Sequence, residues 1–125
     1  MKRMLTTIAL LVISAGCAPN GVSGAHRARD VILEEEILDS GARNALDLVQ
    51  TRRPQWLIVR GNQSLSLAEE SPTVYFNNTR MGHLEALRSI ALASVQSVRF
   101  VSPAQANLRW GTGNSHGAIV ISTEQ

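Results

Sequence analysis

The sequence predicts a small α/β (α+β) domain, in which a mixed β-sheet is combined with short helices. Two patterns predict this fold class: short apolar runs typical of strands alternate with segments of helical spacing, and turn-forming residues separate them. The length agrees, because 125 residues, 44% of them hydrophobic and 18% charged, suit one globular domain. We therefore expect a single modest core.

The N-terminal residues have the organisation of an export signal. Lys2 and Arg3 precede an uncharged, largely apolar stretch, and small residues at positions 14–16 come directly before Cys17, as such signals require. This arrangement resembles the bacterial lipobox, in which a lipid is attached to the cysteine before cleavage. Residues 1–16 are therefore expected to be a lipoprotein signal peptide, and Cys17 the lipidation site, carrying acyl chains such as palmitate.

The segment after the signal is expected to connect a lipid anchor to a folded domain. By resemblance to the sorting of enterobacterial lipoproteins, Ala18 favours the outer membrane, with the domain facing the periplasm. Residues 17–29 contain Pro19, Asn20, Gly21, Ser23 and Gly24 and show no apolar periodicity, which is typical of a flexible linker. Residues 30–125 form the predicted domain.

Charge and cysteine content exclude several function classes. The chain has 12 basic and 10 acidic residues, and removal of Lys2 and Arg3 with the signal leaves no net charge. A domain without a basic excess is not expected to bind nucleic acid. Cys17 is the single cysteine, so an internal disulfide and a multi-cysteine zinc site are excluded.

The domain is expected to begin with a strand, because Val31, Ile32 and Leu33 form a β-branched and aliphatic run. Three glutamates follow at positions 34–36, and we expect them on a solvated turn. An acidic metal site is the alternative. It is disfavoured because adjacent carboxylates point in different directions and no histidine pattern accompanies them.

The next segment has the spacing of a helix, with apolar residues that recur from Ala42 to Val49. Asp39 or Ser40 can cap its start, and Pro54 ends it.

Two strands are expected next. Residues 56–59 form a continuous apolar run after a proline, which predicts a buried strand. Residues 73–76 form another apolar run and end at Asn77 and Asn78, two residues that tolerate left-handed backbone conformations. These two strands are expected to pair.

A short helix is predicted over residues 83–90. Leu84 and Leu87 have helical spacing, while Glu85 and Arg88 fall on the side expected to face water.

The C-terminal part predicts strand, helix and strand. Residues 95–101 alternate, with Val98 and Phe100 on one face and Arg99 on the other. Ser102 is placed to cap a helix that runs to Trp110, with Pro103 at its first position. A glycine-rich loop leads to a last buried strand at 118–121. The core candidates of the whole domain are Trp56, Ile58, Val74, Phe76, Leu84, Leu87, Val98, Phe100, Ile119 and Ile121.

Taken in this order, residues 30–123 resemble the plug domain of TonB-dependent outer-membrane receptors. The resemblance lies in a helix followed by a strand that ends in Arg60-Gly61, a strand that leads into Asn77-Asn78, and a C-terminal block, residues 97–123, in which an aromatic-Gly step and further glycines precede the last strand. The residues that carry the plug-like motif are Arg60, Gly61, Tyr75, Asn77, Asn78, Ser102, Pro103, Trp110, Gly111, Gly113 and Gly117.

The resemblance implies a plug-like domain in a small lipoprotein that has no β-barrel of its own. A full receptor has a 22-stranded barrel, which at about 10 residues a strand needs some two hundred more residues. We therefore expect binding rather than transport. Glycine lets the backbone reverse before a buried strand, so we interpret the motif first as a folding motif and only second as a binding one. Arg60 and Arg99 need not be binding residues, because each can equally be a solvated residue at the end of an element or the ion-pair partner of an acidic residue.

The sequence shows no arrangement typical of catalysis. His26, His83 and His116 are widely spaced and form no metal-binding pattern. A Gly-x-Ser-x-Gly elbow is missing, and Gly111-Thr112-Gly113 matches a nucleotide-binding loop only weakly. We expect no enzyme activity, no cofactor and no metal.

Two functions follow as hypotheses. The first is an outer-membrane-anchored lipoprotein with a non-catalytic plug-like binding module, which interacts with an envelope protein partner and reaches the membrane through its lipid. The alternative is capture of a small periplasmic ligand, a chelate or a glycan, on the loops at 62–71 and 77–81.

Overall fold

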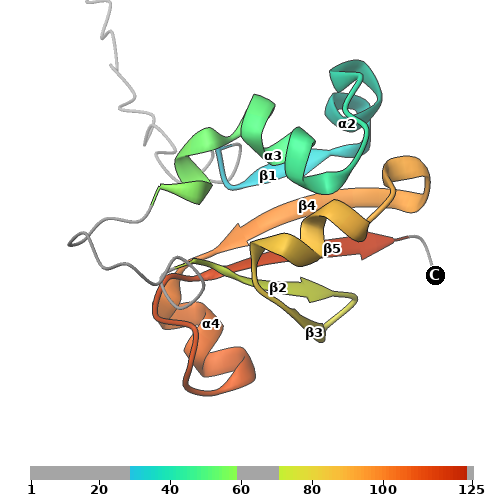
Figure 1. Cartoon of the computed structure of the whole chain (residues 1–125). Coiled ribbons are helices and arrows are strands. Elements are labelled where there is room, and N and C mark those ends of the chain that lie inside the picture. The colour runs from blue at the N-terminus through green and yellow to red at the C-terminus, as the bar shows by residue number, and fades with distance from the viewer. Residues whose placement is uncertain (1–28, 59–70, 124–125) are drawn as a thin grey trace, which may run out of the picture.

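A five-stranded mixed sheet organises the protein, as the computed structural model of residues 29–58 and 71–123 shows (Figure 1). The strand order is β1-β4-β5-β2-β3, with β2 and β5 parallel and the other neighbours antiparallel. This confirms the predicted class of a small α+β fold with a mixed sheet. The strands are β1 (Val31–Leu33), β2 (Thr73–Phe76), β3 (Thr79–Gly82), β4 (Val95–Val101) and β5 (Ala118–Thr123).

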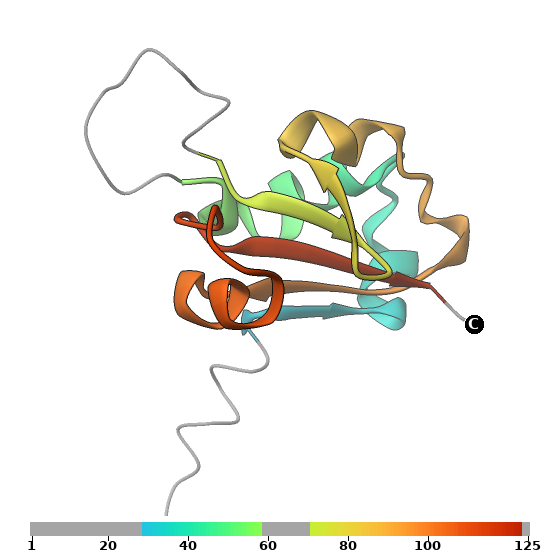
Figure 2. The ribbon, with the colours of Figure 1, turned by 90° about the horizontal axis from the view of Figure 1, so that it is seen from below.

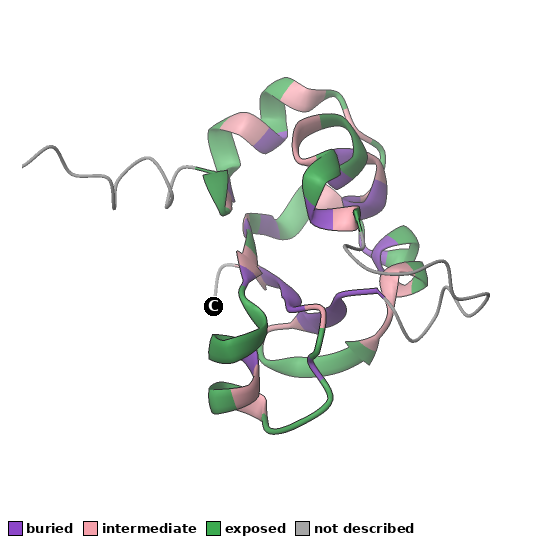
Figure 3. Cartoon of the chain, turned by 90° about the vertical axis from the view of Figure 1, so that its left-hand side faces the viewer, coloured by how far each residue is buried: buried purple, intermediate pink, exposed green. Residues whose placement is uncertain are grey.

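Short helices cover one face of the sheet, which we call the helical face. Figure 3 shows the buried residues concentrated where these helices meet the strands. The main core lies here and includes Ile32, Leu48, Leu87 and Ile119, each fully buried. The helices are α2 (Glu34–Ser40), α3 (Ala45–Arg52) and the 3-10 helices η1 (Pro54–Leu57), η2 (Leu84–Ser89) and η3 (Leu92–Ser94).

The start of the domain differs from the sequence prediction. The three glutamates at 34–36 form the first turn of α2, not a solvated turn. Acidic side chains at a helix N-terminus interact favourably with the helix dipole, which explains why this cluster begins a helix. Gly41, with a φ of 64°, ends α2.

The cap of α3 also differs from the prediction. Asn44, rather than Asp39 or Ser40, is the N-cap residue, and its Oδ1 accepts a hydrogen bond of 2.9 Å from the Asp47 backbone N–H. Ala42 consequently lies before the helix. The helix ends at Arg52, two residues before Pro54, as predicted.

The run at 56–59 was assigned wrongly within the described residues. Trp56 lies in the 3-10 helix η1, and Ile58 is 67% exposed instead of forming part of the core. The predicted pairing of this run with β2 is therefore wrong, because β2 is bordered by β3 and β5. Pro54 presets the backbone dihedral of a helical first turn, and the Trp56 N–H donates to the Arg53 carbonyl at 3.0 Å.

Most of the remaining elements agree with expectation. Asn77 and Asn78 both have positive φ and join β2 to β3 as a hairpin, which is the geometry that such turns require. Strand β3 itself was not predicted. The 3-10 helix η2 (Leu84–Ser89) lies within the helix predicted over residues 83–90, with Leu87 buried and Glu85 and Arg88 exposed.

Most core candidates lie in the interior. Trp56, Val74, Leu87, Val98, Ile119 and Ile121 are buried, and Phe76, Leu84 and Phe100 are partly buried against them.

The second face of the sheet carries α4 (Pro103–Trp110), and we call it the α4 face. Ser102 is the N-cap residue and Pro103 the first helical residue, as predicted, although the Ser102 side chain makes no capping hydrogen bond. A smaller core under α4 contains Tyr75, Val101, Ala106, Ala118 and Val120, with Trp110 against it.

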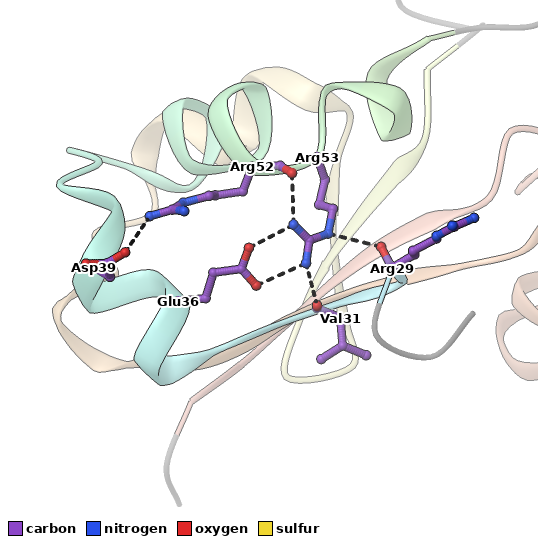
Figure 4. Close-up of polar contacts among 6 residues, drawn as sticks. All are labelled: Arg29, Val31, Glu36, Asp39, Arg52 and Arg53. Carbon is purple, nitrogen blue, oxygen red and sulfur yellow. Dashed lines mark hydrogen bonds and ion pairs between the residues drawn. The ribbon is translucent and has the colours of Figure 1, made fainter. Parts of the chain in front are cut away.

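A single arginine ties α2, α3 and β1 together (Figure 4). The Arg53 guanidinium binds both carboxylate oxygens of Glu36, at 2.8 and 3.0 Å. It also donates to the backbone carbonyls of Arg29, Val31 and Arg52. Its side chain is 17% exposed and that of Glu36 is 29% exposed, so this cluster is shielded from water on most sides.

Candidate binding groove

Helix α4 covers only part of the α4 face (Figure 2). The register of the sheet pairs Arg99 of β4 with Val31 of β1 and with Val120 of β5. Paired residues project to the same side of a sheet, and Val120 packs in the small core under α4. Arg99 therefore projects from the α4 face, beside the helix, and it is exposed.

A groove of about 470 Å³ lies between α4 and this uncovered part of the sheet. We call it the α4 groove. Val101 and Val120 contribute apolar surface from the sheet, and Gln105 and Arg109 belong to α4. Its lining residues are Asn77, Asn78, Arg99, Phe100, Val101, Gln105, Arg109, Val120, Ser122 and Thr123.

Arg109 is held in a defined orientation at the groove. Its Nη2 donates a hydrogen bond of 2.7 Å to Asn78 Oδ1, and its guanidinium lies 4.8 Å from the centre of the Trp110 ring. Trp110 in turn stacks on Tyr75 with ring centroids 4.2 Å apart. A cation over an aromatic face is stabilised, so α4 presents the Arg109 charge from a fixed support.

Asn77 has mainly a structural function at the end of the groove. Its Nδ2 donates to Thr123 Oγ1 at 2.8 Å, and its Oδ1 accepts from the Thr123 N–H at 3.0 Å. Its own N–H donates to the Ile121 carbonyl at 2.9 Å. These bonds continue the contact between β2 and β5 beyond the last ladder pair and hold the Asn77-Asn78 turn beside β5.

The glycine-rich loop between α4 and β5 is closed by Asn114, which the sequence reasoning missed. Asn114 is 2% exposed. Its Nδ2 donates to the Gly111 carbonyl at 3.0 Å, and its Oδ1 accepts from the Tyr75 hydroxyl at 3.1 Å. Buried polar groups are stable when they are paired in this way, so the loop and the aromatic pair under α4 form one unit.

The predicted motif residues thus separate into three groups. Asn77 and Asn78 line the α4 groove, and Tyr75 and Trp110 belong to the small core under α4. The glycines and the helix start shape the backbone around it. Cys17, Arg60 and Gly61, and the loop positions 62–70, lie outside the described residues. The motif residues that shape the backbone are Ser102, Pro103, Gly111, Gly113 and Gly117.

Arg99, Gln105 and Arg109 are groove residues that were not assigned to a binding site from the sequence. The strand alternation had placed Arg99 opposite Val98 and Phe100, and this orientation is confirmed. What the alternation could not show is that α4 leaves this part of the sheet face open.

A second cavity of about 500 Å³ lies at another edge of the domain. Trp56 and Phe100, stacked with centroids 5.9 Å apart, contribute aromatic surface. Ile58, Gln55 and His116 are also part of its lining.

No group of three or more His, Cys, Asp or Glu in residues 29–58 and 71–123 is placed to hold a metal ion. None of the helices in these ranges has the length and apolar character needed to cross a bilayer.

Comparison of the chain with protein-family models, curated proteins and solved structures finds no match.

Proposed function

We propose that this chain is an outer-membrane lipoprotein whose plug-like domain is a non-catalytic binding module for a protein partner in the envelope. The observation that carries the proposal is the α4 groove. It is an open hollow on a sheet face that one helix only partly covers, and its lining combines apolar floor residues with hydrogen-bonding side chains. Apolar surface with a few placed polar groups is typical of binding sites.

The way the groove is built favours recognition over chemistry. Hydrogen bonds to other residues of the domain hold the side chains of Arg109, Asn77 and Asn114 in place. Such support keeps the shape of a surface constant, which lowers the entropic cost of binding a partner. Acyl chains on Cys17 would keep this surface close to the membrane, since two or more chains give a stable anchor.

Affinity isolation after chemical crosslinking of intact envelopes tests this proposal. We expect the lipidated chain to recover a specific envelope protein and to incorporate labelled palmitate. The Cys17→Ala variant should incorporate none and should recover the partner in much smaller amounts. Equal recovery by both variants, or recovery of no envelope protein, contradicts the proposal.

The second cavity favours one alternative, capture of a small ligand such as a glycan or a chelate. Phe100, which is partly buried and stacks on the buried Trp56, offers some aromatic surface to a sugar ring or a planar chelate, and Gln55 and His116 offer polar contacts. Ligand capture predicts a saturable rise in the melting temperature with the ligand alone, whereas a protein-binding module requires the partner.

A further inference from the structure

The charges of the domain are divided between its two faces. Among the described residues, the acidic side chains of α2, α3 and η2 belong to the helical face, and Asp30 precedes β1. Several of them are paired there: Glu36 with Arg53, Asp39 with Arg52 and Glu85 with Arg88.

The α4 face carries arginines without such partners. Arg99 and Arg109 both line the α4 groove, and none of the described residues that line it is acidic. Neither arginine forms an ion pair with a described carboxylate, and Arg109 is bound to a neutral amide, Asn78. Arg80, which the register pairs with Tyr75, projects from the same face and is exposed. A hollow lined by positively charged side chains attracts anions.

Building on the proposed function, we propose that the α4 groove binds an acidic segment of the partner protein, with carboxylates paired to Arg99 and Arg109. Charge complementarity supports this occupant, because a guanidinium presents a planar set of N–H donors that matches a carboxylate. The rest of the lining fits a polypeptide. Gln105, Ser122 and Thr123 supply side-chain groups that can hydrogen-bond a peptide backbone, and the valines of the floor supply apolar contact.

Arg99 and Arg109 contribute to this binding in different ways. Arg109 is oriented beforehand by Asn78 and Trp110, so it loses little conformational entropy when a carboxylate arrives. Arg99 is exposed on β4, and its side chain has no hydrogen bond or ion pair to another described residue, so it can follow the position of a second carboxylate.

Fluorescence anisotropy with a fluorescein-labelled hexaglutamate peptide tests the proposal on the full lipidated chain in a neutral detergent. We expect hexaglutamate to bind, hexaglutamine to bind much more weakly, and added salt to weaken binding. The double variant Arg99→Gln, Arg109→Gln should raise the Kd for hexaglutamate by at least about tenfold, the effect of losing a charge-assisted hydrogen bond.

The matched control is the double variant Arg43→Gln, Arg88→Gln, which removes the same charge from the helical face. Both of these arginines line a separate hollow beside α3 and η2. This control variant should change the Kd less than about twofold, since surface charges further away than a Debye length of about 10 Å are screened. Arg109→Lys, which keeps the charge and removes the planar donor set, should give an intermediate Kd. Circular dichroism and a melting curve establish that each variant is folded.

Three outcomes of the binding measurements overturn the proposal. The first is equal binding of hexaglutamate by the wild type and the groove double variant. The second is binding of phosphatidylglycerol vesicles that depends on Arg99 and Arg109 while hexaglutamate does not bind, which assigns the arginines to a membrane surface. The third is self-association that these arginines control, seen by sedimentation, again without binding of hexaglutamate. If the envelope partner is still recovered by the double variant, the carboxylate proposal fails but the proposed function stands.

Discussion

Gly117→Ala is expected to destabilise the domain by about 3 kcal/mol or more, which lowers the melting temperature of a domain of this size by roughly 15 °C. A Cβ at this position would lie 2.6 Å from the Val101 carbonyl oxygen and 2.8 Å from Phe100 Cζ. The Val101 carbonyl oxygen belongs to the backbone of β4, so it cannot move away without disturbing the sheet. Gly117 is itself fixed, because its carbonyl accepts from the Thr73 N–H at 3.1 Å and its N–H donates to Asn114.

Gly111→Ala is the matched control, because it separates the steric clash from the cost of a positive φ. Gly111 has a φ of 86°, close to the 84° of Gly117, but a Cβ there would meet no atom within 4 Å. Only the backbone strain is expected, about 1–3 kcal/mol, because a φ of 86° with a ψ of −176° lies in a region that is almost restricted to glycine. Thermal denaturation followed by circular dichroism measures both variants. If the two variants lost the same amount of stability, the close approach of Gly117 to β4 would not exist.

Arg53→Ala is expected to cost roughly 2–3 kcal/mol, because it removes the bidentate contact with Glu36 and the bonds to three backbone carbonyls. The figure lies below that for a fully buried pair because the Glu36 side chain remains 29% exposed. Chemical denaturation measures the change in free energy of unfolding. Arg53→Lys should restore less than half of the loss, since an ammonium cannot reach both carboxylate oxygens and the carbonyls together.

The control for this prediction is Arg88→Ala. Arg88 pairs with Glu85 at 3.2 Å, but the two side chains are 66% and 81% exposed, and such surface pairs contribute little. A change within about 0.5 kcal/mol is expected. If Arg53→Ala were as mild as Arg88→Ala, the cluster in Figure 4 would not hold α2 and α3 to β1 in solution.

The elements that local chemistry determines were predicted from the sequence. Residues Val98 to Phe100 of β4 alternate between the two faces, the Asn77-Asn78 turn contains residues that tolerate positive φ, and Pro103 marks the start of α4. In each case the deciding interaction lies within a few residues along the chain.

The errors arose where the local pattern does not choose between alternatives. The apolar run after Pro54 suited a strand or a short helix equally, since periodicity does not separate the two in so short a run. The packing of Trp56 on Phe100, 44 positions away, favours the helix. The cap of α3 was misplaced because Asp, Ser and Asn are about equally good N-cap residues.

The binding groove could be predicted only in part. Asn77 and Asn78 were selected from the plug-like motif, and they do line the groove. Arg99 and Arg109 come from β4 and α4, and only the packing of α4 over one part of the sheet brings them to the same hollow. Asn114 closes the loop by a bond to Tyr75, 39 positions away, which no local pattern indicates.

Site-specific photocrosslinking in intact cells tests most directly that the α4 face is the surface that binds a partner. A photoreactive p-benzoylphenylalanine would replace one of two residues in separate variants. Gln105 lines the α4 groove, and Gln50 is an exposed residue of α3 on the helical face. We expect a discrete adduct with an envelope protein from position 105 and none from position 50, and the adduct should be strongly reduced in the Cys17→Ala chain. An adduct from position 50 alone, or none from either position, would contradict it.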